Sequence, residues 1–186
     1  MRRGNRWVLA LAGVALSLAM GLSQPANAGS ATDIDAGVSA ALTTLYGNDP
    51  AAKELASKAK AILVFPKVVK GGLLIAGHYG EGALRVGDKS AGYYYTSAVS
   101  YGLQAGGQAY GYVMFFMNDE ALDYLEDSGG FEIGVGPSVV VMDEGMAQSM
   151  TSTTATQNVY AIIFDQKGLM AGMGLQGSKI TQFTPR

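Results

Sequence analysis

The fold of this chain is decided by one glycine-punctuated stretch, Ala61-Ile-Leu-Val-Phe-Pro-Lys-Val-Val-Lys-Gly-Gly-Leu-Leu-Ile-Ala-Gly-His-Tyr-Gly-Glu-Gly-Ala-Leu84. Its first residues, 62–65, predict a short buried strand, and Pro66 is expected to end that strand because proline cannot donate a ladder hydrogen bond. Glycine then recurs at positions 71, 72, 77, 80 and 82. Glycine in strands permits bulges, sharp curvature and close approach of another backbone. The stretch therefore predicts a strongly curved sheet.

The residues around this stretch predict further strands. Segments 73–86 and 90–100 are expected to pair across a turn at Val86-Gly87-Asp88-Lys89. The remaining predicted strands are 103–117, 131–142 (interrupted near Pro137), 158–165, 168–175 and 179–183. Residues 29–186 hold 23 of the 26 glycines, about twice the usual frequency of ~7%. The predicted fold class is α+β, with a mainly antiparallel, Gly-rich curved sheet or partly closed barrel.

Helices are predicted before the sheet and once within it. A helix is expected to begin at Thr32-Asp33 and to end at Gly47-Asn48, and its apolar residues recur every three or four positions, which forms one stripe: Ile34, Val38, Leu42 and Leu45. Asp49-Pro50 predicts a second helix, with Asp as the N-cap and Pro at the first helical position. A short acidic helix is expected over 118–125, ended by Gly129-Gly130.

The N-terminus has the pattern of a secretory signal peptide. Three arginines precede an apolar run over 8–22, and Ala26-Asn27-Ala28 forms an A-x-A cleavage site. We expect cleavage after Ala28, which leaves residues 29–186 as a single domain. The expected location is periplasmic or secreted, with peripheral membrane association.

Composition narrows the classes of function. Residues 29–186 contain no cysteine, ten basic and fifteen acidic residues, so their net charge is −5 and general nucleic-acid binding is not expected. The charges are unevenly placed. Seven of the ten cations lie within 53–89, and six of the fifteen anions lie within 119–132. This pattern indicates a basic face opposed by an acidic helix.

Three ordered segments resemble the SYLF domain, a lipid-binding module known from eukaryotic endocytic and actin-patch proteins and widespread in bacteria. The first is the stretch quoted above. The second is 100–108, continued through 113–117 to the helix at 118–125, and the third comprises 160–165 and 167–177. The resemblance implies binding of phosphoinositide or other anionic lipid through an N-terminal amphipathic helix and a basic surface. A bacterial anionic phospholipid is the more natural ligand for an exported protein. We do not expect the actin binding of some eukaryotic family members in this chain, because we find no SH3 or FYVE domain in it and because it is expected to leave the cell.

The residues that match this lipid-binding surface are the apolar stripe and five lysines. These predicted lipid-binding residues are Ile34, Val38, Leu42, Leu45, Lys53, Lys58, Lys60, Lys67 and Lys70. Five lysines near an anionic surface contribute at most ~5 kcal/mol, equivalent to a dissociation constant no tighter than ~0.1 mM. An apolar contribution is therefore required. The stripe could supply it by inserting at the headgroup boundary, or it could pack on the sheet instead.

Catalytic and metal chemistry is not expected. Asp127-Ser128-Gly129-Gly130 is similar to a protease nucleophile loop but follows Glu126 and reads as a helix end, and 172–177 fits a dinucleotide fingerprint without the helix and acidic residue that must follow. His78 is the only histidine and the chain has no cysteine, so the nitrogen and sulfur ligands of a zinc site are not available. No cofactor is predicted. The alternative function is a cell-envelope structural or interaction module that binds a peptide or protein partner.

Overall fold

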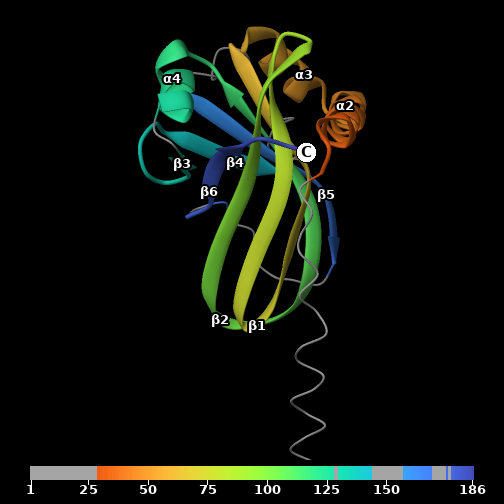
Figure 1. The fold of residues 1–186 in the computed structure, drawn as a ribbon, viewed down its shortest axis with the longest axis vertical. Coiled ribbons are helices and arrows are strands. Elements are labelled where there is room, and N and C mark those ends of the chain that lie inside the picture. The colour runs from red at the N-terminus through yellow and green to blue at the C-terminus, as the bar shows by residue number, and fades with distance from the viewer. Residues whose placement is uncertain (1–28, 128–129, 144–156, 169–174, 176) are drawn as a thin grey trace, which may run out of the picture.

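The structure is a computed structural model that describes residues 29–127, 130–143, 157–168, 175 and 177–186 (Figure 1). The predicted signal peptide, the glycine at position 129, residues 144–156 and most of the strand predicted at 168–175 lie outside these residues. Two helices come first, followed by a curled sheet into which one more helix is inserted. The predicted α+β class with a strongly curved, mainly antiparallel sheet is confirmed.

Local capping explains the two N-terminal helices. Helix α2 spans Ala31–Asn48, and its N-cap Ser30 accepts a hydrogen bond from the Asp33 backbone N–H at 3.1 Å. Helix α3 spans Pro50–Lys58, and the Asp49 carboxylate caps it by accepting from the Ala51 and Ala52 N–H groups at 2.9 and 3.2 Å. Both predicted helices are confirmed, with α2 beginning one residue earlier than expected.

The two longest strands run much further than their sequences predict. Strand β1 is Ala61–Val86 and strand β2 is Lys89–Phe116, and the predicted turn at 86–89 joins them. The prediction that Pro66 ends a short strand is wrong, because β1 continues through it with a register shift between Phe65 and Val68. Pro66 thus lies in an irregularity of the ladder, where a missing N–H is tolerated. The two strands predicted at 90–100 and 103–117 are likewise one strand.

Strand β1 folds back on itself. A Cβ on Gly80 would lie 2.7 Å from the Lys67 carbonyl oxygen, and one on Gly82 would overlap the Val64 carbonyl oxygen. Residues 61–72 and 75–86 therefore form two halves of one strand that lie against each other. The bend between them coincides with a register shift between Leu73 and Ile75.

The sheet takes its shape from this bend, because β2 follows β1. Among the described residues the sheet has six strands, in the order β3 (Phe131–Glu132), β6 (Lys179–Phe183), β2, β5 (Val159–Gly168) and β4 (Val139–Asp143), and β1 pairs with β2. Residues 93–97 of β2 pair with β6 (Lys179–Phe183), whereas residues 108–116 pair with β5 (Val159–Gly168). The first part of β2 thus belongs to one layer of the curled sheet and the last part to the other.

The shorter elements complete the two layers. Helix α4 spans Asp119–Asp127, close to the predicted acidic helix. The strand predicted at 131–142 with an interruption near Pro137 is two separate strands, β3 (Phe131–Glu132) and β4 (Val139–Asp143), and Pro137 lies between them. They lie in different places, because β3 pairs with β6 and β4 pairs in parallel with β5. Strands β3 and β4 lie at opposite ends of the strand order, so one continuous strand could not occupy both positions.

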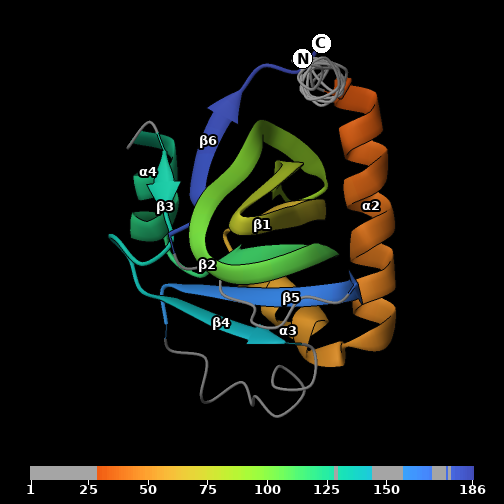
Figure 2. The same ribbon diagram turned by 90° about the horizontal axis from the view of Figure 1, so that it is seen from below.

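Two apolar cores hold the layers and helices together. One core lies inside the curl, where Phe65, Tyr112 and Phe131 are fully buried and Leu125 of α4 packs beside them. The other core joins α2 and α3 to the outer face of the sheet. Figure 2 shows α2 running along one side of the curled β1–β2 pair, with α4 on the opposite side. Within the described residues, we find no helix with the length and apolar character needed to cross a membrane.

Candidate functional site

The predicted apolar stripe of α2 lies inside the molecule. Ile34, Val38 and Leu45 are buried, and Leu42 is half-buried. Their neighbours in the outer core come from β1, β2, β4 and β5 and include Val64, Val113, Phe115, Met142 and Phe164. In the folded protein the stripe therefore packs on the sheet, and its predicted contact with lipid would require α2 to leave the sheet.

One acidic residue of α2 connects the helix to the β1–β2 turn region. The Asp35 carboxylate accepts hydrogen bonds from Ser90 Oγ at 2.5 Å and from Tyr93 Oη at 3.0 Å. Arg85 lies beside it, with its Nη2 atom 3.8 Å from Asp35 Oδ1 and 3.2 Å from the Asp35 carbonyl oxygen. This polar cluster, which sequence reasoning missed, holds α2 on the sheet next to Ile34, the first residue of its apolar stripe.

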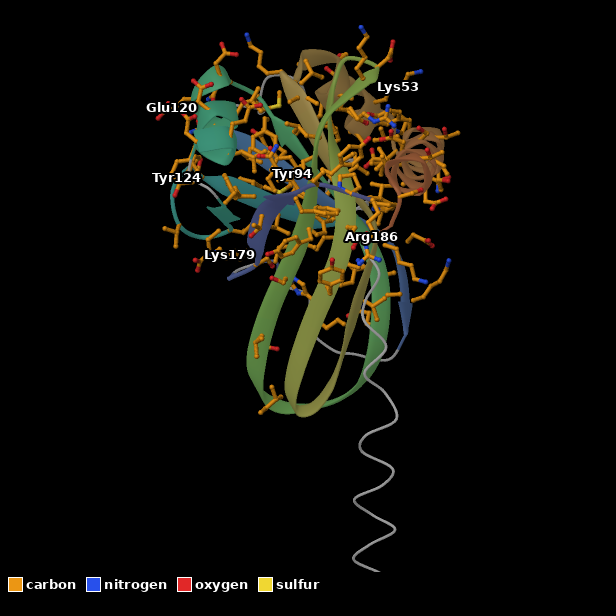
Figure 3. The ribbon with its side chains drawn as sticks, in the orientation of Figure 1. Lys53, Tyr94, Glu120, Tyr124, Lys179 and Arg186 are labelled. Carbon is orange, nitrogen blue, oxygen red and sulfur yellow. The ribbon has the colours of Figure 1, made fainter. Side chains whose placement is uncertain are left out.

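The five predicted lysines do not form one continuous group. Lys53, Lys58 and Lys60 are exposed on or just after α3. Lys58 pairs with Glu54 at 2.7 Å, and Lys60 pairs with Asp119 of the acidic helix at 3.2 Å. Figure 3 shows Lys53 and Glu120 at the same end of the molecule. Acidic and basic residues therefore mix at this end.

Lys67 and Lys70 lie elsewhere, on a projection that we call the arm: residues 67–80 of β1 together with residues 96–109 of β2. The ribbons of β1 and β2 extend beyond the other labelled elements to the bend (Figure 1). The arm contains no acidic residue, since none occurs between Glu54 and Glu81 or between Asp88 and Asp119. The strand segments of the arm are thus free of carboxylates, whereas Lys60 pairs with Asp119 of the acidic helix and Lys67 lies in a groove with Asp33 and Glu81.

Exposed apolar side chains are a second property of the arm. Among the described residues, the large hydrophobic side chains most open to solvent include Val99 at 64%, Ile75 at 56% and Val69 at 53%. Gly77 pairs with Val99 and Ile75 with Tyr101, so Ile75 and Val99 are diagonal neighbours on one face of the ladder. Val69 lies on the other half of the folded strand. Periodicity could not have shown this, because the same alternation would serve a buried strand.

A groove lies where the arm meets the N-terminus of α2. It encloses about 430 Å³, and its wall includes Ile34, Lys67, Val69, Tyr79 and Glu81. Tyr79 Oη donates a hydrogen bond to Glu81 Oε1 at 2.8 Å. The pKa of Tyr79 is raised, mainly because the hydroxyl is desolvated by burial and secondly because of this hydrogen bond. Asp33 also lines the groove, which thus combines Lys67 with two carboxylates and apolar surface, a mixture that does not favour a small anion.

The inside of the arm holds buried polar side chains. His78, Thr96 and Gln108 are each less than a tenth exposed, and Thr96 Oγ1 lies 3.4 Å from His78 Nε2. Burial, with the positive charge of Lys70 as the second cause, lowers the pKa of His78 to about 4. The imidazole is therefore neutral at pH 7. These residues support the arm from within.

The side chains that could ligate a metal ion are dispersed over the described residues. Their His, Asp and Glu side chains form no group of three that could hold a metal ion. Ser128 of the protease-like sequence, and residues 172–174 and 176 of the dinucleotide-like sequence, lie outside the described residues.

Comparison with known proteins identifies one family. The sequence model of Ysc84, described as Las17-binding protein actin regulator, matches residues 97–184. The match begins within the arm on β2 and continues through α4 and all the later strands to the end of β6. No curated protein matches the chain.

Proposed function

Because residues 97–184 belong to the Ysc84 (SYLF) family, a non-catalytic domain family associated with lipid binding, we propose that this protein docks on anionic phospholipid membranes and performs no reaction there. The proposed ligand is a membrane surface that carries anionic phospholipid. The proposed setting is the periplasm or the exterior of the cell, reached by cleavage of residues 1–28.

The observation that carries the proposal is the separation of charge in the fold. The strand segments of the arm contain Lys67 and Lys70 and no acidic residue, with Asp33 and Glu81 beside Lys67 at their base, whereas α4 carries Asp119, Glu120, Asp123, Glu126 and Asp127. A protein with net negative charge meets an anionic bilayer only through a locally positive part. The arm is such a part.

Electrostatics alone supplies too little energy. Each lysine near an anionic surface contributes about 1 kcal/mol. Lys58 and Lys60 already face Glu54 and Asp119, so their contribution to docking is smaller than that of unpaired lysines. With α2 packed on the sheet, its stripe adds nothing to the affinity. The apolar contribution must therefore come from another part of the surface.

Flotation with liposomes tests the proposal. The protein is mixed with vesicles of phosphatidylcholine alone or with a third of phosphatidylglycerol, and the floating fraction is measured at low and at high salt. We expect recovery with the anionic vesicles and a decline as salt rises, because salt screens surface charge. Equal recovery with both vesicles, or none with either, would contradict the proposal.

The proposed export is tested separately. Expression of the full chain in a bacterium, followed by intact-mass measurement of the protein in the periplasmic fraction, should give the mass of residues 29–186. Retention of the first 28 residues on the purified protein would show that the segment is not cleaved.

A further inference from the structure

The far end of the arm is the part of this molecule that has both of the properties that docking on an anionic bilayer requires. It carries lysine without acidic residues, and it exposes apolar side chains. We propose that this end of the arm inserts into the headgroup region of an anionic bilayer, with Ile75 inserting most deeply and Val99 and Lys70 at the level of the phosphates. The inference rests on the proposed membrane binding and assigns it to a specific part of the fold.

The placement of the residues along the arm matches the layers of a bilayer surface. Ile75 directly follows the bend of β1, and Lys70 precedes the bend by only a few residues. At ~3.3 Å per strand residue, Lys70 lies roughly 10–15 Å from the end of the arm measured along the strand, and Lys67 lies about 10 Å further. Interfacial elements insert their apolar part about 5–10 Å into the headgroup and acyl boundary. Ile75 can thus reach the acyl boundary, while Lys70 and Val99, whose partner Gly77 is as far from the bend as Lys70, remain among the headgroups and Lys67 lies outside them.

The distribution of the exposed side chains favours a bilayer over a protein partner. Val69 and Ile75 lie on opposite halves of the folded strand, and Val99 lies on the neighbouring strand. The apolar surface therefore surrounds a narrow end instead of forming one face. A fluid bilayer can contact such an end from all sides, whereas a folded protein would contact one side of it.

The interior of the arm is consistent with shallow insertion. Thr96, Gln108 and neutral His78 lie between its halves, shielded from solvent. The backbone along the sides of the arm is paired in the β1–β2 ladder, whereas at its end the register shifts between Leu73↔Ala105 and Ile75↔Tyr101. Unpaired N–H and C=O groups are excluded from the hydrocarbon core, so the end of the arm inserts no deeper than the headgroup region, where water remains.

A matched pair of double variants tests the inference. Ile75→Ser with Val99→Ser removes apolar surface from the end of the arm. The control, Val86→Ser with Val135→Ser, makes the same kind of change at residues 46% and 55% exposed but away from that end. We expect the first variant to bind phosphatidylglycerol-containing vesicles at least tenfold more weakly than wild type, and the control to bind within twofold of wild type. Circular dichroism should give the wild-type spectrum for both.

A fluorescent reporter locates the insertion directly. Trp7 is the only tryptophan and lies in the predicted signal peptide. In a chain with Trp7→Phe, we place a single tryptophan by Val99→Trp or, as the control, by Val86→Trp. Anionic vesicles should shift the emission of the first to the blue, and brominated lipid should quench it, while the control should remain unchanged.

The outcomes separate this inference from the proposed function. If wild type floats with anionic vesicles but the Ile75/Val99 variant floats equally well, or if the two tryptophans respond alike, the inference is overturned and membrane binding stands. If wild type does not float, both are overturned. If the variant loses only self-association, measured by sedimentation, the end of the arm contacts a second copy of the chain and the inference is wrong.

Discussion

Gly82 lies where the two halves of β1 come closest. A Cβ at this position would overlap the Val64 carbonyl oxygen and lie 2.9 Å from the Phe65 ring. Because backbone cannot move aside as a flexible side chain can, we expect Gly82→Ala to lower the free energy of unfolding by about 1–3 kcal/mol. Urea denaturation followed by circular dichroism measures this change.

The control for that substitution is another glycine with space around it. Gly47 lies in the last turn of α2, and no atom lies within 4 Å of an added Cβ. Gly47→Ala should leave stability unchanged or raise it by up to about 1 kcal/mol, since glycine is a poor helix former. Equal destabilisation by both substitutions would show that the contact between the halves of β1 is not the cause.

His78 makes the arm sensitive to acid. Its pKa is lowered to about 4 in the folded protein, against an ordinary value near 6.5. Between these values the unfolded chain binds a proton that the folded chain does not, so stability falls as pH decreases from about 6.5 to about 4. The free energy of unfolding, measured at pH 7 and pH 5, should fall more for wild type than for His78→Gln. The same decrease in both would assign the effect to other groups.

Helix α2 depends on both its apolar stripe and the Asp35 cluster for its place on the sheet. Asp35→Ala removes the acceptor for Ser90 and Tyr93 and the carboxylate beside Arg85. Hydrogen bonds to charged groups contribute about 1.5–3 kcal/mol when buried. Since Asp35 is partly exposed, we expect a loss of about 1–2 kcal/mol and faster amide exchange in the first turns of α2, measured by hydrogen–deuterium exchange. Asp123→Ala, at an exposed position of α4, should change neither.

The elements show where local sequence is sufficient and where it is not. The starts of α2 and α3 were predicted almost to the residue. The side chains of Ser30 and Asp49 accept hydrogen bonds from backbone N–H groups no more than three residues further along the chain, so the signal is local. The extent of β1 was not predicted, because whether Pro66 ends a strand depends on a register shift against β2. The interruption of 131–142 near Pro137 was predicted, but the separate positions of its two parts were not, because pairing of β3 with β6 and of β4 with β5 involves residues more than fifteen positions away.

Charge is distributed unevenly along the molecule. The helical end carries both acidic and basic residues, whereas the strand segments of the arm carry lysine and no acidic residue. Lys67→Gln with Lys70→Gln should therefore weaken binding to anionic vesicles more than Lys53→Gln with Lys58→Gln, although both variants remove two charges. Losing about 1 kcal/mol per lysine corresponds to roughly 30-fold for the first pair. Vesicle sedimentation at two salt concentrations measures both losses. Equal losses would place the docking surface on all five lysines, as the sequence predicts.

The candidate site was predicted only in its chemistry. The sequence indicates lysines and apolar residues for lipid contact, and their roles stay predictions. It could not show that the stripe of α2 is buried while Val69, Ile75 and Val99 are exposed. That outcome depends on which apolar residues find partners across the sheet, and those partners lie far along the chain. Carboxylate-free stretches at 55–80 and 89–118 were the signal that could have pointed to the arm.

The antiparallel pairing of β1 with β2 also constrains the order in which contacts form as the chain folds. Pairing begins beside a two-residue connection, at Val86 and Lys89, and each further pair encloses more chain until Ala61 meets Phe116, 55 positions apart. The first contacts cost little loop entropy, and the later ones depend on them. Since β5 and β6 add to β2 from the end of the chain, we expect folding in milliseconds to seconds, as for other proteins rich in non-local pairings. A translocated chain would then remain unfolded until its last strand has emerged.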